Sequence, residues 1–145
     1  MKNLSVLAWL FAAALPVCLA ATSPPVLVVT DAWARKAPGV DVAAVYLSLS
    51  NTGTRPIVVV GVQSPSATSS MIHESAVRNG QAQMRMKEKI VIAPGQKVSF
   101  APGGLHIMLS GLKSPFTVGK SVPLVLLTAD GAQVVVAAVV KPLVP

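Results

Sequence analysis

Residues 71–108 read MIHESAVRNGQAQMRMKEKIVIAPGQKVSFAPGGLHIM, and they hold both histidines and most of the methionines of the sequence. The dipeptide Asn79-Gly80 lies between two extended segments of this stretch. Both residues tolerate the positive φ of a type I′ turn, so this dipeptide is the strongest short signal for a β-hairpin. We therefore predict that residues 71–78 pair with residues 81–92.

The register of this hairpin follows from its two-residue turn. Counting outward from the turn places Ser75 opposite Met84 and His73 opposite Met86. Cross-strand partners share a face of the sheet, and so do residues two apart on one strand. Met71, His73, Met84 and Met86 are therefore expected to emerge on one side of the hairpin.

A second candidate strand, residues 105–109, carries the other histidine. Its sequence Leu-His-Ile-Met-Leu alternates apolar and functional side chains. The side formed by Leu105, Ile107 and Leu109 suits the core, so His106 and Met108 are expected to face away from it, toward solvent.

The rest of the chain indicates an all-β fold. Val, Thr, Pro and Gly recur, and short apolar runs alternate with turn signals such as Ala93-Pro94-Gly95 and Asp130-Gly131. This pattern predicts a β-sandwich with Greek-key connections, formed by residues 22–145 as a single domain. The expected strands are 26–30, 42–50, 57–62, 71–78, 81–92, 96–100, 105–109, 122–128 and 132–140, with a polar loop at 64–70.

Residues 1–21 have the pattern of a secretory signal peptide. Lys2 precedes an apolar run from Leu4 to Leu15, and small residues follow near Ala20 and Ala21. The apolar run is shorter than the ~20 residues of a membrane-spanning helix, which disfavours a retained anchor. We expect cleavage near Ala20 or Ala21 and export to the periplasm. A lipoprotein anchor at Cys18 is disfavoured because the preceding Val17 is bulky.

Cys18 is the only cysteine, so cleavage leaves a mature chain without thiols. This excludes disulfides, thiolate zinc sites, thiol catalysis and blue-copper centres. The remaining soft ligands are imidazole and thioether, and together they favour Cu(I) over zinc, calcium and magnesium. A single Met is usually core filling, but three same-face pairs from so few residues favour a metal site.

Other functions are disfavoured by composition. The formal net charge is +7, or +6 without Lys2, but the basic residues are scattered and aromatic residues make up only 4% of the chain. Nucleic-acid binding is therefore not expected. The positive charge favours attraction to acidic partner surfaces or an anionic membrane face, and a solvated basic surface without a role is the alternative. No carboxylate pair and no nucleophile motif is evident, so we do not expect an enzyme.

The spacing His73-x10-Met84-x21-His106-x-Met108 resembles the signature of the PCuAC family of periplasmic copper chaperones. Residues 31–35, 43–47, 51–53 and 102–112 also resemble that family, so the similarity extends over essentially the whole mature chain. The chain departs from the family at Glu74-Ser75, where a methionine often follows the first histidine.

The resemblance implies a cupredoxin-like β-sandwich that binds one Cu(I) per monomer through His73, Met84, His106 and Met108. Met71 and Met86 are auxiliary candidates, and direct pairing favours Met86 opposite His73. The family is associated with delivery of copper to the binuclear copper centre of cytochrome c oxidase subunit II, often alongside Sco-type proteins. A copper-storage or resistance protein and a metal-free interaction module are the alternative functions.

Overall fold

The computed structural model describes residues 26–143, which form strands and no helix. The predicted signal peptide therefore lies outside the described residues, and within them no helix could cross a membrane. The strands are β1 (Leu27–Lys36), β2 (Val42–Asn51), β3 (Ile57–Gln63), β4 (Ala67–Arg78), β5 (Gln81–Met86), β6 (Ile90–Ile92), β7 (Lys97–Phe100), β8 (Leu105–Leu112), β9 (Ser121–Thr128) and β10 (Gln133–Val140).

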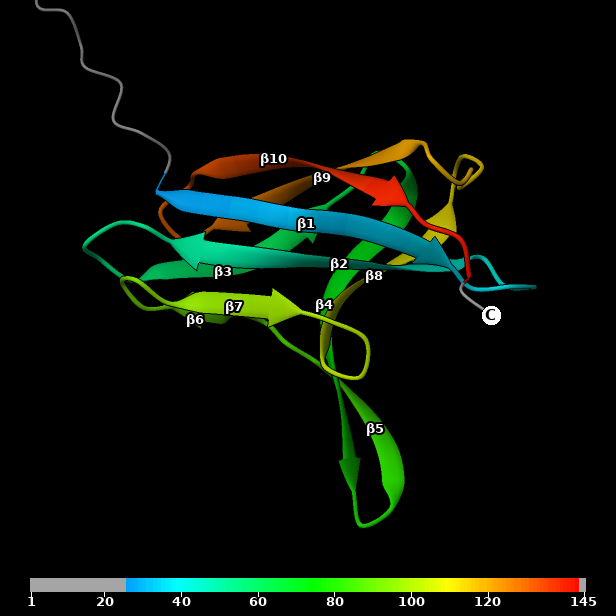
Figure 1. Ribbon diagram of the computed structural model, residues 1–145, viewed down its shortest axis with the longest axis horizontal. Coiled ribbons are helices and arrows are strands. Elements are labelled where there is room, and N and C mark those ends of the chain that lie inside the picture. The colour runs from blue at the N-terminus through cyan, green and yellow to red at the C-terminus, as the bar shows by residue number, and fades with distance from the viewer. Residues whose placement is uncertain (1–25, 144–145) are drawn as a thin grey trace, which may run out of the picture.

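The strands form one continuous hydrogen-bonded path that folds over itself into a sandwich. Its order is β5-β4-β8-β2-β1-β10-β9-β3-β6, and β7 pairs with β2 next to β8. The strands pair antiparallel, except that β1 meets β10 in parallel. In Figure 1 the strands β1, β2 and β10 run side by side across the body, and the β4–β5 hairpin extends beyond it. The predicted all-β, Greek-key class is confirmed.

The hydrophobic core lies between the two halves of this path. Alternate residues of β2 and β8 on one side meet alternate residues of β9 on the other, as expected for two inner sheet faces. The largest fully buried apolar side chains are Leu47, Leu49, Val45, Val59, Ile92, Ile107, Leu109, Leu124 and Leu126. The other alternate residues of β2 and β8 therefore face away from the core.

β1 contains a β-bulge in front of Trp33. Thr30 pairs with Ser48 and Trp33 pairs with Tyr46, so β1 has one residue more than β2 over this interval. Asp31 has a φ of 55°, the left-handed conformation that a bulge residue can adopt. The inward residues before the bulge include Leu27, and those after it include Ala34.

The predicted hairpin is confirmed in turn and register. Asn79 and Gly80 have φ values of 51° and 74°, as a type I′ turn requires. His73 pairs with Met86 and Ser75 pairs with Met84. The second strand of the hairpin is shorter than the predicted 81–92, because β5 ends at Met86. The residues at the end of the predicted strand form a separate strand, β6, which pairs with β3.

Two other predicted boundaries are wrong. The segment expected to be a polar loop contains the first residues of β4, where Ala67 pairs with Leu112 and is buried. The first strand was expected to end at Thr30, but it continues to Lys36 through the bulge. In both places pairing with a neighbouring strand overrides the polar composition that suggested a loop.

Candidate metal centre

The candidate ligands lie on three adjacent strands because β4 pairs with β5 on one edge and with β8 on the other. His73 on β4 lies directly opposite His106 on β8, and it also faces Met86 on β5. One row along the sheet, Met71 lies opposite Met108. Cross-strand partners share a face, so both histidines and these three methionines belong to the same face. The prediction that Met71, His73 and Met86 share one face is confirmed.

The two imidazole rings are close to each other. The ring centroids of His73 and His106 are 5.9 Å apart, and the planes meet edge to face at 88°. The Tyr46 ring lies 6.5 Å from that of His106 on the side away from His73. His106 is only 7% exposed, so the prediction that it faces solvent is wrong. Neighbouring side chains on the same face cover it, and it forms the floor of the site.

A backbone hydrogen bond orients His106. Its Nδ1 lies 3.0 Å from the carbonyl oxygen of Gly104. A carbonyl oxygen can only accept, so Nδ1 must carry the proton and donate it, which leaves the Nε2 lone pair free. Histidines that bind metals commonly donate their second ring nitrogen in this way. Gly104 also accepts a hydrogen bond at 3.0 Å from the amide of Ser75, so β4 and the turn before β8 are joined at this point.

His73 lacks such a partner. Its Nδ1 is buried and has no hydrogen bond within residues 26–143. Burial and, to a smaller extent, the charge that His106 can carry lower the pKa of His73 below its ordinary value. The neutral imidazole, with a lone pair to offer, is therefore favoured at neutral pH. A buried ring nitrogen without a hydrogen-bond partner can donate its lone pair to a metal ion, so His73 fits a ligand position.

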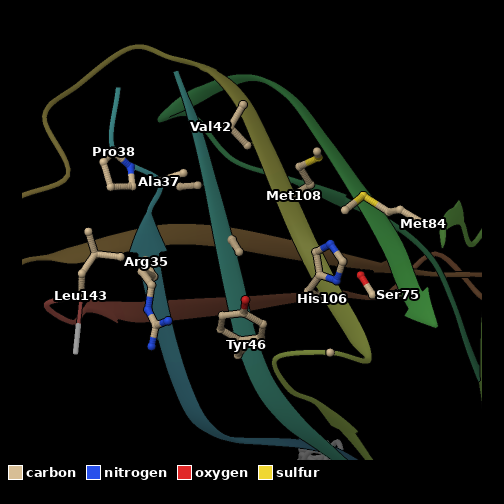
Figure 2. Close-up of a pocket in the computed structure, with 13 residues that line it drawn as sticks. Arg35, Ala37, Pro38, Val42, Tyr46, Ser75, Met84, His106, Met108 and Leu143 are labelled. Atoms are coloured by element: carbon tan, nitrogen blue, oxygen red, sulfur yellow. The ribbon is translucent and has the colours of Figure 1, made fainter. Parts of the chain in front are cut away.

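Met84 and Met108 complete a cavity with His106. The cavity has a volume of about 340 Å³, and Ser75 and Tyr46 also line it. Figure 2 shows both thioethers and the His106 imidazole around a common space, which they enter from β5 and β8. Met84 is 55% exposed whereas Met108 is partly buried, so Met84 forms the outer rim. Its placement one row from His73 makes it a diagonal neighbour, as the register predicted.

The auxiliary candidates lie at the open side of the same face. Met71 is 43% exposed and Met86 is 58% exposed. Neither lines the cavity that Met84, His106 and Met108 share, although each is a direct cross-strand partner of a candidate ligand. All six predicted positions thus share one face, but only Met84, His106 and Met108 line the cavity. His73 is half-buried beside His106, and Met71 and Met86 lie at the surface.

Sequence reasoning missed the neighbours that β1 and β2 contribute. The ring of Trp33 lies 4.5 Å from that of Tyr46, which continues the row of rings toward His106. Arg35 lines the cavity from β1. The signal for them was weak, because a β-bulge that cannot be read from hydropathy decides which face these residues occupy.

Comparison with known proteins identifies the family of the chain. A family model described as "Putative lipoprotein LpqE-like" matches residues 27–140. A Leifsonia xyli subsp. xyli protein named "Putative lipoprotein Lxx21020" is 39% identical over 114 residues, which are 78% of this chain and 68% of that protein. The chain belongs to the LpqE-like family, which is of the PCuAC type.

Solved structures place the fold of this PCuAC-type chain among copper-binding domains. The Cu(I) form of DR1885 from Deinococcus radiodurans is 35% identical, with a TM-score of 0.66 over 83% of this chain and 81% of that one. The apo PCuAC domain from PmoF1 is 27% identical, with a TM-score of 0.68 over 83% of this chain and 98% of that domain. The predicted resemblance to the PCuAC family is therefore confirmed.

Proposed function

We propose that this PCuAC-type protein is a periplasmic Cu(I) chaperone that binds one Cu(I) ion per monomer through His73, Met84, His106 and Met108. The observation that supports the proposal most strongly is the direct pairing of His73 with His106, flanked on the same face by thioethers. Two imidazoles and two thioethers form a soft donor set that suits a monovalent ion. The Cu(I) form of a solved relative is consistent with it.

The different exposure of the ligands suggests how copper would leave. His106 is buried and held by the Gly104 carbonyl, so it would be slow to move. Met84 lies at the rim on the projecting hairpin, where an incoming ligand can reach it. Transfer would proceed by ligand exchange, in which the acceptor's thiolate displaces a thioether before the histidines release the ion. Met71 and Met86 are exposed enough to hold the ion during this exchange.

The proposed acceptors are the copper domain of cytochrome c oxidase subunit II and Sco-type thiol proteins, as the family resemblance implies. The protein would act as a binding protein and not as an enzyme, and as a monomer. Storage or resistance would use the same ligands without passing the ion on. A transfer assay with apo acceptor distinguishes delivery from storage: delivery requires copper to appear on the acceptor faster than free dissociation allows.

The ligand set is tested by anaerobic Cu(I) titration in competition with a chromophoric chelator. We expect a stoichiometry of one, and a loss of affinity on His73→Ala or His106→Ala larger than the roughly 10–100-fold cost of removing a supporting hydrogen bond. Met84→Leu and Met108→Leu should each weaken binding. Val77→Ala is the matched control, because Val77 lies on the same hairpin, is exposed and has no donor atom. Unchanged affinity in all four ligand variants would leave the interaction module as the better proposal.

Export and anchoring need a separate measurement. We infer a cleaved signal peptide that ends near Ala20 or Ala21, whereas the names of the relatives describe lipoproteins. Mass spectrometry of the mature protein separates the two outcomes. A chain that begins after Ala20 or Ala21 supports the inference, and a chain that begins at an acylated Cys18 refutes it.

A further inference from the structure

Arg35 lies on the same sheet face as the candidate copper ligands. The register aligns Arg35 on β1 with Ala44 on β2, Ala44 with Met108 on β8, and Met108 with Met71 on β4. Successive partners in such a row share a face, and adjacent strands are ~4.8 Å apart. Arg35 is therefore two strands away from Met108, with the small side chain of Ala44 between them.

The space above Ala44 is open. Arg35, Ala44, Tyr46, His106 and Met108 all line the cavity of about 340 Å³ described above. A larger residue at position 44 would fill this space, but a methyl group leaves it free. Figure 2 shows Arg35 and Tyr46 on one side of the cavity and the thioethers on the other. Arg35 and three of the proposed copper ligands, Met84, His106 and Met108, thus line one cavity.

Arg35 is held in place but has no anionic partner. Its Cζ lies 5.1 Å from the centroid of the Trp33 ring, and the Nζ of Lys141 lies 5.0 Å from the same centroid. Two cations therefore lie around one indole ring, which orients them through cation–π attraction. Within residues 26–143 the one ion pair joins Glu74 to Lys87, and no carboxylate lines the cavity.

The Nε atom of Arg35 adds a second, independent sign of a missing partner. It is buried, yet it has no hydrogen-bond acceptor in the described part of the chain. A buried donor without an acceptor costs free energy, and a guanidinium has the planar fork that matches a carboxylate. A carboxylate paired with the guanidinium would offset the positive charge of Arg35, Lys141 and a bound Cu(I).

We propose that Arg35 forms a carboxylate-binding subsite in the cavity that also contains His106 and Met108. The ligand is either an acidic side chain of the protein that exchanges copper or a free small carboxylate. Its role in copper exchange rests on the proposed function, but binding of the carboxylate itself requires no metal. A carboxylate held at Arg35 would place the chain that carries it over the cavity that Met84 and Met108 also line.

The subsite is tested on metal-free full-length protein in which Trp9→Phe leaves Trp33 as the only indole. Sodium acetate is titrated against sodium chloride at equal ionic strength, and Trp33 fluorescence and the indole N–H resonance are followed. We expect a saturable change with acetate and none with chloride. Arg35→Gln should weaken acetate binding at least tenfold, and Lys141→Gln should weaken it less. Arg78→Gln, an exposed arginine on the hairpin, is the matched control and should titrate like the parent.

The two sources of the carboxylate are distinguished with a short peptide that has capped ends and whose only charged residues are two central glutamates. Binding tighter than that of acetate supports an acidic protein partner, and binding equal to that of acetate supports a free small carboxylate. Equal responses to acetate and chloride, or a parent-like acetate titration of folded Arg35→Gln, would overturn the subsite. Because copper is absent, this result is independent of the Cu(I) titration, so failure of one proposal is distinguishable from failure of the other.

Discussion

Replacing Asn51 by alanine should destabilise the fold without removing a candidate ligand. Asn51 ends β2 and is 1% exposed. Its Nδ2 donates to the carbonyl oxygens of Arg55 at 2.8 Å and Ile92 at 2.9 Å, and its Oδ1 accepts from the Gly53 amide at 2.9 Å. One side chain therefore joins the end of β2, the loop that follows and β6.

The expected cost follows from these three contacts. Each net hydrogen bond contributes about 1 kcal/mol, and the Ile92 carbonyl that loses its side-chain partner is attached to a fully buried residue. We therefore expect a loss of about 3 to 4 kcal/mol in the free energy of unfolding. For a domain of this size that corresponds to a decrease in Tm of roughly 10–15 °C.

Urea denaturation of the apo-protein measures this loss, and Thr54→Ala in the exposed loop next to it is the control. Cu(I) affinity of the folded Asn51→Ala protein should equal that of the parent, because the candidate ligands lie on β4, β5 and β8. A loss below ~1 kcal/mol would refute the bonding argument. A change in Cu(I) affinity would instead show that the Asn51 loop and the copper site are coupled.

Three further perturbations probe the backbone and the histidines. Gly111→Ala should lower the free energy of unfolding by about 1–3 kcal/mol, because Gly111 has a φ of 64° and a Cβ there would lie 2.7 Å from the Thr68 Oγ1. Gly103→Ala is the control in the same denaturation experiment. Gly103 has a φ of 81° but a Cβ there would have no atom within 4 Å, so the loss should be smaller. The lowered pKa of His73 means that the unfolded chain binds its proton more readily. Stability of the apo-protein should therefore be level above pH 6.5 and fall as the pH drops from there through the lowered pKa. His73→Gln should flatten that slope in thermal scans at several pH values, and an unchanged slope would contradict the pKa assignment. Gly80→Ala should destabilise the type I′ turn by ~1 kcal/mol and broaden the Met84 methyl resonance by NMR, whereas a sharp, unshifted signal would mean that the turn does not position Met84.

The hairpin and the ligand face could be predicted because their signals are local. Asn79-Gly80 specifies a turn type, the turn sets the register, and the period of two then assigns Met71, His73 and Met86 to one face. The alternation of residues 105–109 placed His106 opposite the core side for the same reason. These steps need no knowledge of distant residues.

The burial of His106 could not be predicted, because it depends on side chains from β2 and β4 that cover it. Alternation shows which residues share a face, but it does not show what packs on that face. The division of residues 81–92 into β5 and β6 is similar. Ile90 pairs with Val59, a partner far away in the sequence that no local pattern indicates.

The bulge residue in β1 determines which side chains of the strand face the core and which face away from it. Before the bulge Leu27 and Val29 pack against the core, and after it Ala32 and Ala34 do so, so inward positions change from odd to even numbers at Asp31. If Asp31 instead occupied a regular position in the ladder, without a bulge, the inward positions would keep odd numbers throughout the strand. Trp33 and Arg35 would then turn into the interior, against a layer that accommodates only the methyl group of Ala34, and the cavity would lose its cation. Loss of this one bulge, with every side chain of the strand retained, would thus be enough to remove the positive charge beside the candidate copper ligands.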